Sequence, residues 1–135
     1  MKIGIYNHQH YRGGCPGCSQ TYVKGMINDA SKCKALARRL YGSDCEYINY
    51  TDLGDYPPDN LNRPGFKRME EDIKNGDIDA IFTIKAEKIS NKLDLILEFY
   101  KLCKVHQIDF ITVANGPDIM HTLDILLAKP KEEIS

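Results

Sequence analysis

The sequence predicts a three-layer α/β sandwich built around a mainly parallel sheet of four to five strands. Short apolar runs alternate with amphipathic runs along the chain, no segment repeats, and no linker divides it. Such a β-α alternation places parallel strands side by side with helices on both faces. At 135 residues the chain can bury one core. We therefore assign residues 1–128 to one domain and residues 129–135 to a tail.

The first half of the chain predicts two strands and two helices. The opening run KIGIYN is a short apolar strand, and residues 21–40 carry apolar side chains at three- and four-residue spacing, which indicates a helix. CEYINY, residues 45–50, is the second strand, and a polar loop rich in Pro, Asp and Asn follows as far as Leu61. Pro64 suits the first turn of the next helix, which ends at Gly76.

The second half repeats this alternation. IDAIFTIK, residues 78–85, is a nearly continuous apolar run, which is typical of a strand covered on both faces. An amphipathic helix over residues 91–107 leads to the strand DFITVA. A short last helix over residues 118–128 ends before Pro130. The whole order is therefore βαβαβαβα.

Charge, apolar pattern and cysteine count limit the class of protein. A net charge of −1 argues against binding nucleic acid through overall positive charge, because phosphate binding depends on Lys and Arg. No apolar run approaches the roughly 18 residues that span a bilayer, and the N-terminus lacks a signal-peptide pattern. Five cysteines, an odd number, fit a reducing compartment better than a disulfide framework. We expect a cytoplasmic protein with no membrane partner.

The stretch LNRPGFKRM, residues 61–69, is the most distinctive motif. Serine site-specific recombinases, the resolvase/invertase family, carry Leu-Asp/Asn-Arg-Pro-Gly-Phe-x-x-Met here. Residues 61–113 resemble that family's catalytic domain in the order and spacing of a helix, a strand ending at Lys85, a polar turn and a long helix. The first two strands also fit. The resemblance implies the family's fold, a link to DNA recombination and no cofactor.

The first strand departs from the family where its chemistry lies. In the family a serine hydroxyl attacks a DNA phosphodiester and becomes covalently linked to it, while arginines bind the phosphate oxygens. The family strand reads Tyr-x-Arg-x-Ser, and the same register here gives Tyr6, His8 and His10. His8 stands at the arginine position and His10 at the nucleophile position. Histidine can itself form covalent intermediates, so His10 remains an alternative nucleophile.

The turn after the third strand also lacks some of the charged residues that the family has there. The family reads Asp-Arg-Leu-Ser/Gly-Arg, and residues 87–91 here read EKISN. Glu87 keeps the acid, Lys88 keeps a charge without the fork of a guanidinium, and Asn91 loses the charge. Arg63 alone matches a family active-site arginine outright.

The resemblance and these replacements together predict a function. We expect an inactive recombinase-type domain that is a non-cleaving partner of an active recombinase. It would form a homodimer or a hetero-oligomer and would reach DNA through that partner or through a larger protein. No helix-turn-helix or zinc-ribbon pattern is present, so the chain is either an excised domain or a complete remnant.

The insert YRGGCPGCSQ supports a different function. Cys15 and Cys18 have a common zinc-ligand spacing, and His8 or His10 could complete three of four ligand positions. A Cys-x-x-Cys that opens a helix also suits thiol-redox chemistry, because the helix N-terminus stabilises a thiolate. The plainest alternative is a Gly-rich surface loop with two ordinary thiols. The second function is therefore a repurposed zinc-binding or redox module with no DNA role.

Overall fold

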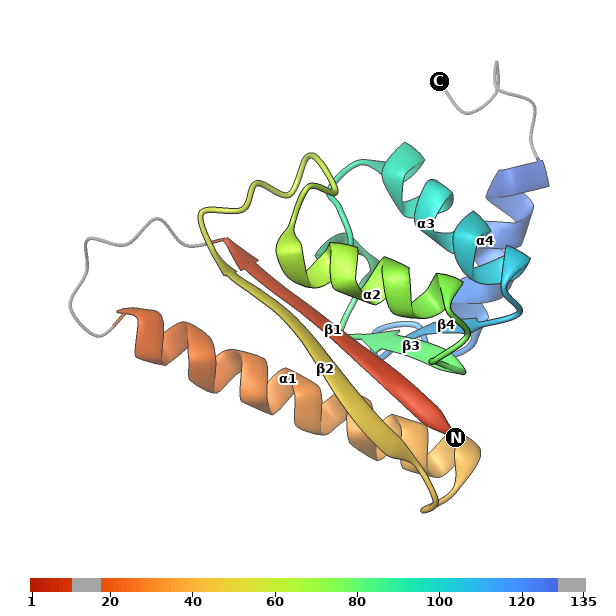
Figure 1. Ribbon diagram of the computed structural model, residues 1–135, viewed down its shortest axis with the longest axis horizontal. Coiled ribbons are helices and arrows are strands. Elements are labelled where there is room, and N and C mark those ends of the chain that lie inside the picture. The colour runs from red at the N-terminus through yellow and green to blue at the C-terminus, as the bar shows by residue number, and fades with distance from the viewer. Residues whose placement is uncertain (11–17, 129–135) are drawn as a thin grey trace.

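The computed structural model describes residues 1–10 and 18–128, and the side chains of the first helix from residue 23 onward. Strands and helices alternate from the first residue of this range to the last (Figure 1). The elements in chain order are β1 Lys2–His10, α1 Cys18–Tyr41, β2 Glu46–Gly54, α2 Pro64–Lys74, β3 Ala80–Thr83, the short 3₁₀ helix η1 Ala86–Lys88, α3 Leu93–Val105, β4 Asp109–Thr112 and α4 Asp118–Ala128.

The four strands form one sheet in the order β2-β1-β3-β4, and every neighbouring pair is parallel. β1 and β2 pair along their whole length, from Lys2 opposite Glu46 to His10 opposite Gly54. The chain crosses from β1 to β2 through α1, and it continues on the other side of β1 with β3 and β4. The carboxyl end of β1 therefore lies where the strand order reverses, which is the usual place for a site in such sheets.

Helices cover both faces of the sheet, so the molecule has three layers (Figure 1). On one face α1 packs over β1 and β3, and the buried side chains there include Ile3, Ile5 and Cys33. On the other face α2, α3 and α4 enclose a larger core that includes Tyr6 and Phe66. Residues of opposite parity on β1 serve the two cores, because successive side chains of a strand point to opposite faces.

The predicted fold class is confirmed, and the sheet has four strands within the described residues. Both long strands extend further than their apolar runs predict. β1 continues through polar residues to His10, and β2 reaches Gly54 through a segment predicted as loop. β3 is shorter than predicted and ends at Thr83. No helix in the described ranges is long and apolar enough to cross a membrane.

Candidate functional site at the end of β1

Three side chains of β1 with even numbers, Tyr6, His8 and His10, have contacts on the side of the sheet that α2 covers. Tyr6 and His8 are buried, and His10 is partly exposed at the strand end. The segment 55–63, which connects β2 to α2, folds over this end of β1. The register predicted from the sequence therefore places both histidines on one face, beside the motif that contains Arg63.

Arg63 is fully buried, and its guanidinium is completely occupied by the protein. Nε and Nη2 donate to the carbonyl oxygen of Asn60 at 3.3 and 3.0 Å. Nη1 donates to the Tyr6 hydroxyl at 2.7 Å and to the Lys88 carbonyl at 3.2 Å. Nη2 also donates to the carbonyl of Ile89. A guanidinium has five N–H donors, so none is left for a bound phosphate in this structure.

Asp52 supplies the negative charge for this buried arginine through the Tyr6 hydroxyl. The hydroxyl accepts from Arg63 and donates to Asp52 Oδ2 at 2.8 Å. Burial raises the pKa of Tyr6 well above its ordinary value, which keeps the hydroxyl protonated as a donor. Arg63, Tyr6 and Asp52 therefore form one buried chain of hydrogen bonds that joins two opposite charges.

Asp52 also accepts hydrogen bonds from the first backbone N–H groups of α2. The backbone N–H groups of Gly65 and Phe66 donate to its two oxygens at 2.8 and 3.0 Å. A carboxylate is favourable at this end of a helix. A Cβ on Gly65 would lie 2.9 Å from the Thr51 carbonyl and 3.0 Å from the Asp52 carboxylate. The Arg-Pro-Gly motif therefore brings the start of α2 directly against β2.

His8 is held by the 55–63 segment. Its Nε2 lies 2.6 Å from the carbonyl oxygen of Tyr56, and because a carbonyl only accepts, Nε2 carries the proton. Burial, followed by the Arg63 charge, lowers the pKa of His8. The ring is therefore a neutral group that anchors a loop.

His10 forms a His–Asp pair with the same segment. Its Nε2 lies 3.0 Å from Asp55 Oδ1, and the side chains are 34% and 68% exposed. Such a pair orients the imidazole and leaves Nδ1 as the nitrogen that could act as a base or nucleophile. The position that the sequence predicts to correspond to the family's serine therefore holds an imidazole that is oriented by a carboxylate.

The turn after β3 closes the site from the other side. Lys88 Nζ donates to the His8 carbonyl at 3.0 Å, and burial lowers the pKa of Lys88. Ser90 is buried and donates to the Pro58 carbonyl at 2.8 Å, which ties the turn to the 55–63 segment. Glu87 and Asn91 have exposed side chains. The structure thus brings Arg63, Lys88, His8 and His10 together and leaves Glu87 and Asn91 at the surface.

The zinc and redox hypotheses depend on residues outside this description. Cys15 lies outside the described residues, and Cys18 begins α1 with its side chain outside them. Within residues 1–10 and 18–128, no cluster of three or more His, Cys, Asp or Glu side chains could hold a metal ion. The zinc site with Cys15, Cys18, His8 and His10 stays a prediction.

Sequence reasoning missed the residues that close the site. Asp52, Asp55 and Tyr56 lie in the segment that was predicted to be a polar loop. One signal was available for Asp52, since it follows Tyr50 at the spacing that returns to the same face of a strand. The acceptors on Asn60, Lys88 and Ile89 are backbone carbonyls, so no side-chain identity could reveal them.

Comparison with known proteins agrees with the fold described above. The family model described as resolvase, N terminal domain, matches residues 28–130. The N-terminal catalytic domain of TP901-1 integrase is 18% identical, with 94% of each chain covered and a TM-score of 0.70. A resolvase family site-specific recombinase from Streptococcus pneumoniae is 20% identical, with 99% of this chain and 90% of that chain covered and a TM-score of 0.69.

A third solved structure has a similar fold, and the curated proteins give no match. A serine recombinase from Sulfolobus solfataricus is 18% identical, with 93% of this chain and 80% of that chain covered and a TM-score of 0.57. No curated protein matches the chain. The structural likenesses establish the fold at these levels of identity.

Proposed function

The chain belongs to the resolvase N-terminal domain family, and from this premise we propose that it is a non-cleaving subunit in site-specific DNA recombination. It assembles with a recombinase that carries the catalytic serine, and it reaches DNA through that partner or a larger protein. Its own strand β1 makes no covalent link to DNA.

The occupied guanidinium of Arg63 carries the proposal. Phosphoryl transfer is catalysed mainly by positioned positive charge on the transferring group. Arg63 has all five donors on protein acceptors. Binding a phosphate through this arginine would take donors from the buried carbonyl of Ile89 and from the partly buried carbonyls of Asn60 and Lys88, and an unpaired buried group costs about 1–3 kcal/mol. The arginine therefore supports the fold of the site rather than a phosphodiester.

Lys88 and His10 do not supply the phosphate binding that an arginine would give. Lys88 already donates to the His8 carbonyl, and an ammonium binds phosphate as a point charge without bidentate geometry. His10 is held by Asp55 and could attack phosphorus. No arginine fork of residues 1–10 and 18–128 contacts His10, so within that part of the chain such an attack lacks the charge stabilisation that the reaction requires.

A covalent-trapping experiment tests the absence of cleavage. The chain is incubated with a supercoiled plasmid library of fragments from the genome that encodes it, and the reaction is stopped with denaturant. We expect no DNA covalently attached to the protein. An adduct that acid releases and alkali does not is a phosphoramidate on His10. The opposite lability identifies a serine ester, and either adduct overturns the proposal.

A second experiment tests whether the chain assembles with an active recombinase. The chain is mixed with each resolvase-family recombinase that the same genome encodes, and the complexes are measured by native mass spectrometry. We expect one or more mixed complexes containing both chains. If only homo-oligomers of the chain form with every recombinase, the partner role is wrong, whatever the trapping experiment gives.

A further inference from the structure

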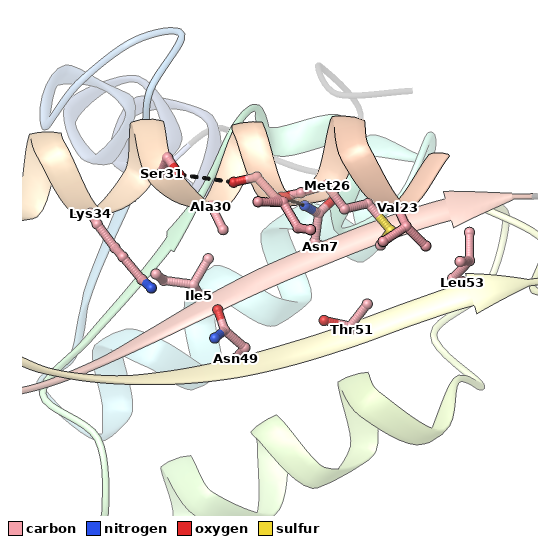
Figure 2. A pocket seen from close by; sticks show the side chains of 11 residues that line it. Ile5, Asn7, Val23, Met26, Ala30, Ser31, Lys34, Asn49, Thr51 and Leu53 are labelled. Atoms are coloured by element: carbon pink, nitrogen blue, oxygen red, sulfur yellow. Dashed lines mark hydrogen bonds between the residues drawn. The ribbon is translucent and has the colours of Figure 1, made fainter. Parts of the chain in front are cut away.

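A groove lies on the opposite face of the sheet from the histidines (Figure 2). Because α1 packs mainly over β1 and β3, it covers β2 only in part, and Asn49 and Thr51 of β2 remain exposed. The groove has a volume of about 340 Å³, which is within the usual range for small-molecule sites. Its lining comes from three elements: Ile5 and Asn7 of β1, Asn49, Thr51 and Leu53 of β2, and Val23, Met26, Ile27, Ala30, Ser31 and Lys34 of α1.

The helix forms an apolar wall of this groove. Val23 is 41% exposed and Ile27 is 63% exposed, and they are one turn apart on α1. Met26 and Ala30 line the same side and lie deeper. Leu53 extends the apolar surface at the end of β2. A ligand with an apolar body would remove this surface from water, which is favourable in proportion to the area covered.

Asn7 at the floor of the groove has an unsatisfied acceptor. Its side chain is only 6% exposed, and its Nδ2 donates to the Met26 carbonyl at 3.1 Å. Its Oδ1 has no hydrogen-bond partner among the described residues. Buried polar atoms are nearly always paired, and each exception requires an explanation. In Figure 2, Asn7 lies between α1 and the strands, and it is one of the residues that line the groove. The missing partner is an N–H or O–H donor.

Lys34 places a positive charge in the groove, away from Asn7. Its Nζ lies 5.5 Å from the centre of the Tyr47 ring, and no carboxylate pairs with it in the described ranges. Ile5 lines the groove two residues before Asn7, so these two positions are about 7 Å apart along the strand. Lys34, Ile5 and Asn7 all line the groove, so a ligand that reaches Lys34 with an anionic group and Asn7 with a donor would place its apolar body over the part of the floor that includes Ile5.

We propose that this groove binds a small organic acid with an apolar body, a carboxylate at Lys34 and an N–H or O–H donor at Asn7. A peptide strand added to β2 fits less well. Arg68 of α2 already donates to the Asn49 carbonyl at 3.1 Å, and an added strand would compete for the backbone of β2. The site is separate from the recombinase-type site, because it occupies the α1 face of the sheet.

Indole-3-acetate is the probe that tests the proposal, since it combines an aromatic body, a ring N–H and a carboxylate. In ¹H–¹⁵N spectra of the full chain, we expect saturable shifts of the Asn7 side-chain amide and of Ala30. Benzofuran-3-acetate has an oxygen in place of the N–H, and we expect it to bind at least about fivefold more weakly because Oδ1 stays unpaired. The absence of saturable shifts, or equal affinity of the two acids, would overturn the proposal.

A pair of lysine variants tests the charge. Lys34→Met removes the groove cation, and Lys32→Met removes an exposed lysine of the same helix that does not line the groove. We expect indole-3-acetate to bind about threefold more weakly to the first variant, as for a partly exposed ion pair, and unchanged to the second. Equal effects in both variants would contradict a specific carboxylate position. Shifts that follow protein concentration instead of probe would identify an interface between copies and reject the small ligand.

Discussion

On the α2 face of β1, Tyr6, His8 and His10 each have a hydrogen-bond partner in another segment, whereas on the α1 face the buried Oδ1 of Asn7 has no partner among the described residues and belongs to a residue that lines an open groove. The two faces belong to the same strand. In the contacts of its β1 side chains the first face is closed, although a pocket of about 380 Å³ lined by Asp52, Tyr56 and Gly65 adjoins it, and the second face is open along the groove. The two faces therefore differ in whether the polar side chains of β1 are paired, and not in whether there is room beside them.

Substitution of Arg63 tests the closed face most strongly. In Arg63→Met, the carbonyls of Asn60 and Ile89 lose their donor and Asp52 loses its compensating charge. We expect the free energy of unfolding to fall by about 3–5 kcal/mol, as when one partner of a buried ion pair is removed. Urea unfolding measures it.

Arg68→Met is the matched control for that substitution. Arg68 is exposed, with one hydrogen bond to Asn49 and a ring contact with Tyr50. We expect a loss below about 1 kcal/mol, because exposed charges contribute little. Equal losses in the two variants would mean that the buried network has no special role.

Removal of the Tyr6 hydroxyl separates the two charges without removing either. Tyr6→Phe leaves Arg63 Nη1 and Asp52 each without one partner, and we expect a loss of about 2 kcal/mol in urea unfolding. Tyr41→Phe is the control, since its hydroxyl donates to Asp109 from a half-buried ring. A Tyr6→Phe loss no larger than that of the control would argue against a continuous chain of hydrogen bonds.

His8 gives the closed face a dependence on pH. Burial lowers the pKa of His8 in the folded state, so the unfolded chain takes up a proton first as the pH falls. The contribution of neutral His8 is therefore present above its ordinary pKa of about 6.5 and decreases as the pH falls toward the lowered value. We expect wild type to lose more stability than His8→Gln between pH 7 and pH 5 (about two units). Parallel profiles would contradict this.

The smallest effect is expected on the open face. Asn7→Leu removes the bond to Met26 and also removes the unpaired oxygen. Replacing a half-satisfied polar group by an apolar group of similar size is nearly neutral, so we expect a change within about 1 kcal/mol. A loss as large as that of Tyr6→Phe in thermal or urea unfolding would mean that Asn7 is a structural residue and not a site residue.

The sequence predicts the order of elements well, because apolar periodicity reflects burial against helices. It fails at the ends of β1 and β2, where pairing of backbone groups extends the strands through His10 and Gly54, and Leu53 is the single apolar residue in these extensions. The register that places His8 and His10 on one face is contained in the sequence. The closure of Arg63 is not, because most of its partners are carbonyls that only the folded chain brings together.

The guanidinium of Arg63 joins two segments that are distant along the chain, residues near Asn60 and the turn at Lys88 and Ile89. Ser90 Oγ and the Asn91 backbone N–H also donate to the Pro58 carbonyl, so displacing the segment that carries Arg63 breaks several bonds to the turn at once. The two segments are therefore expected to open together, and amide hydrogen exchange in both should report a common opening free energy. The buried guanidinium couples the local unfolding of a loop to that of a turn some 25 residues further along the chain.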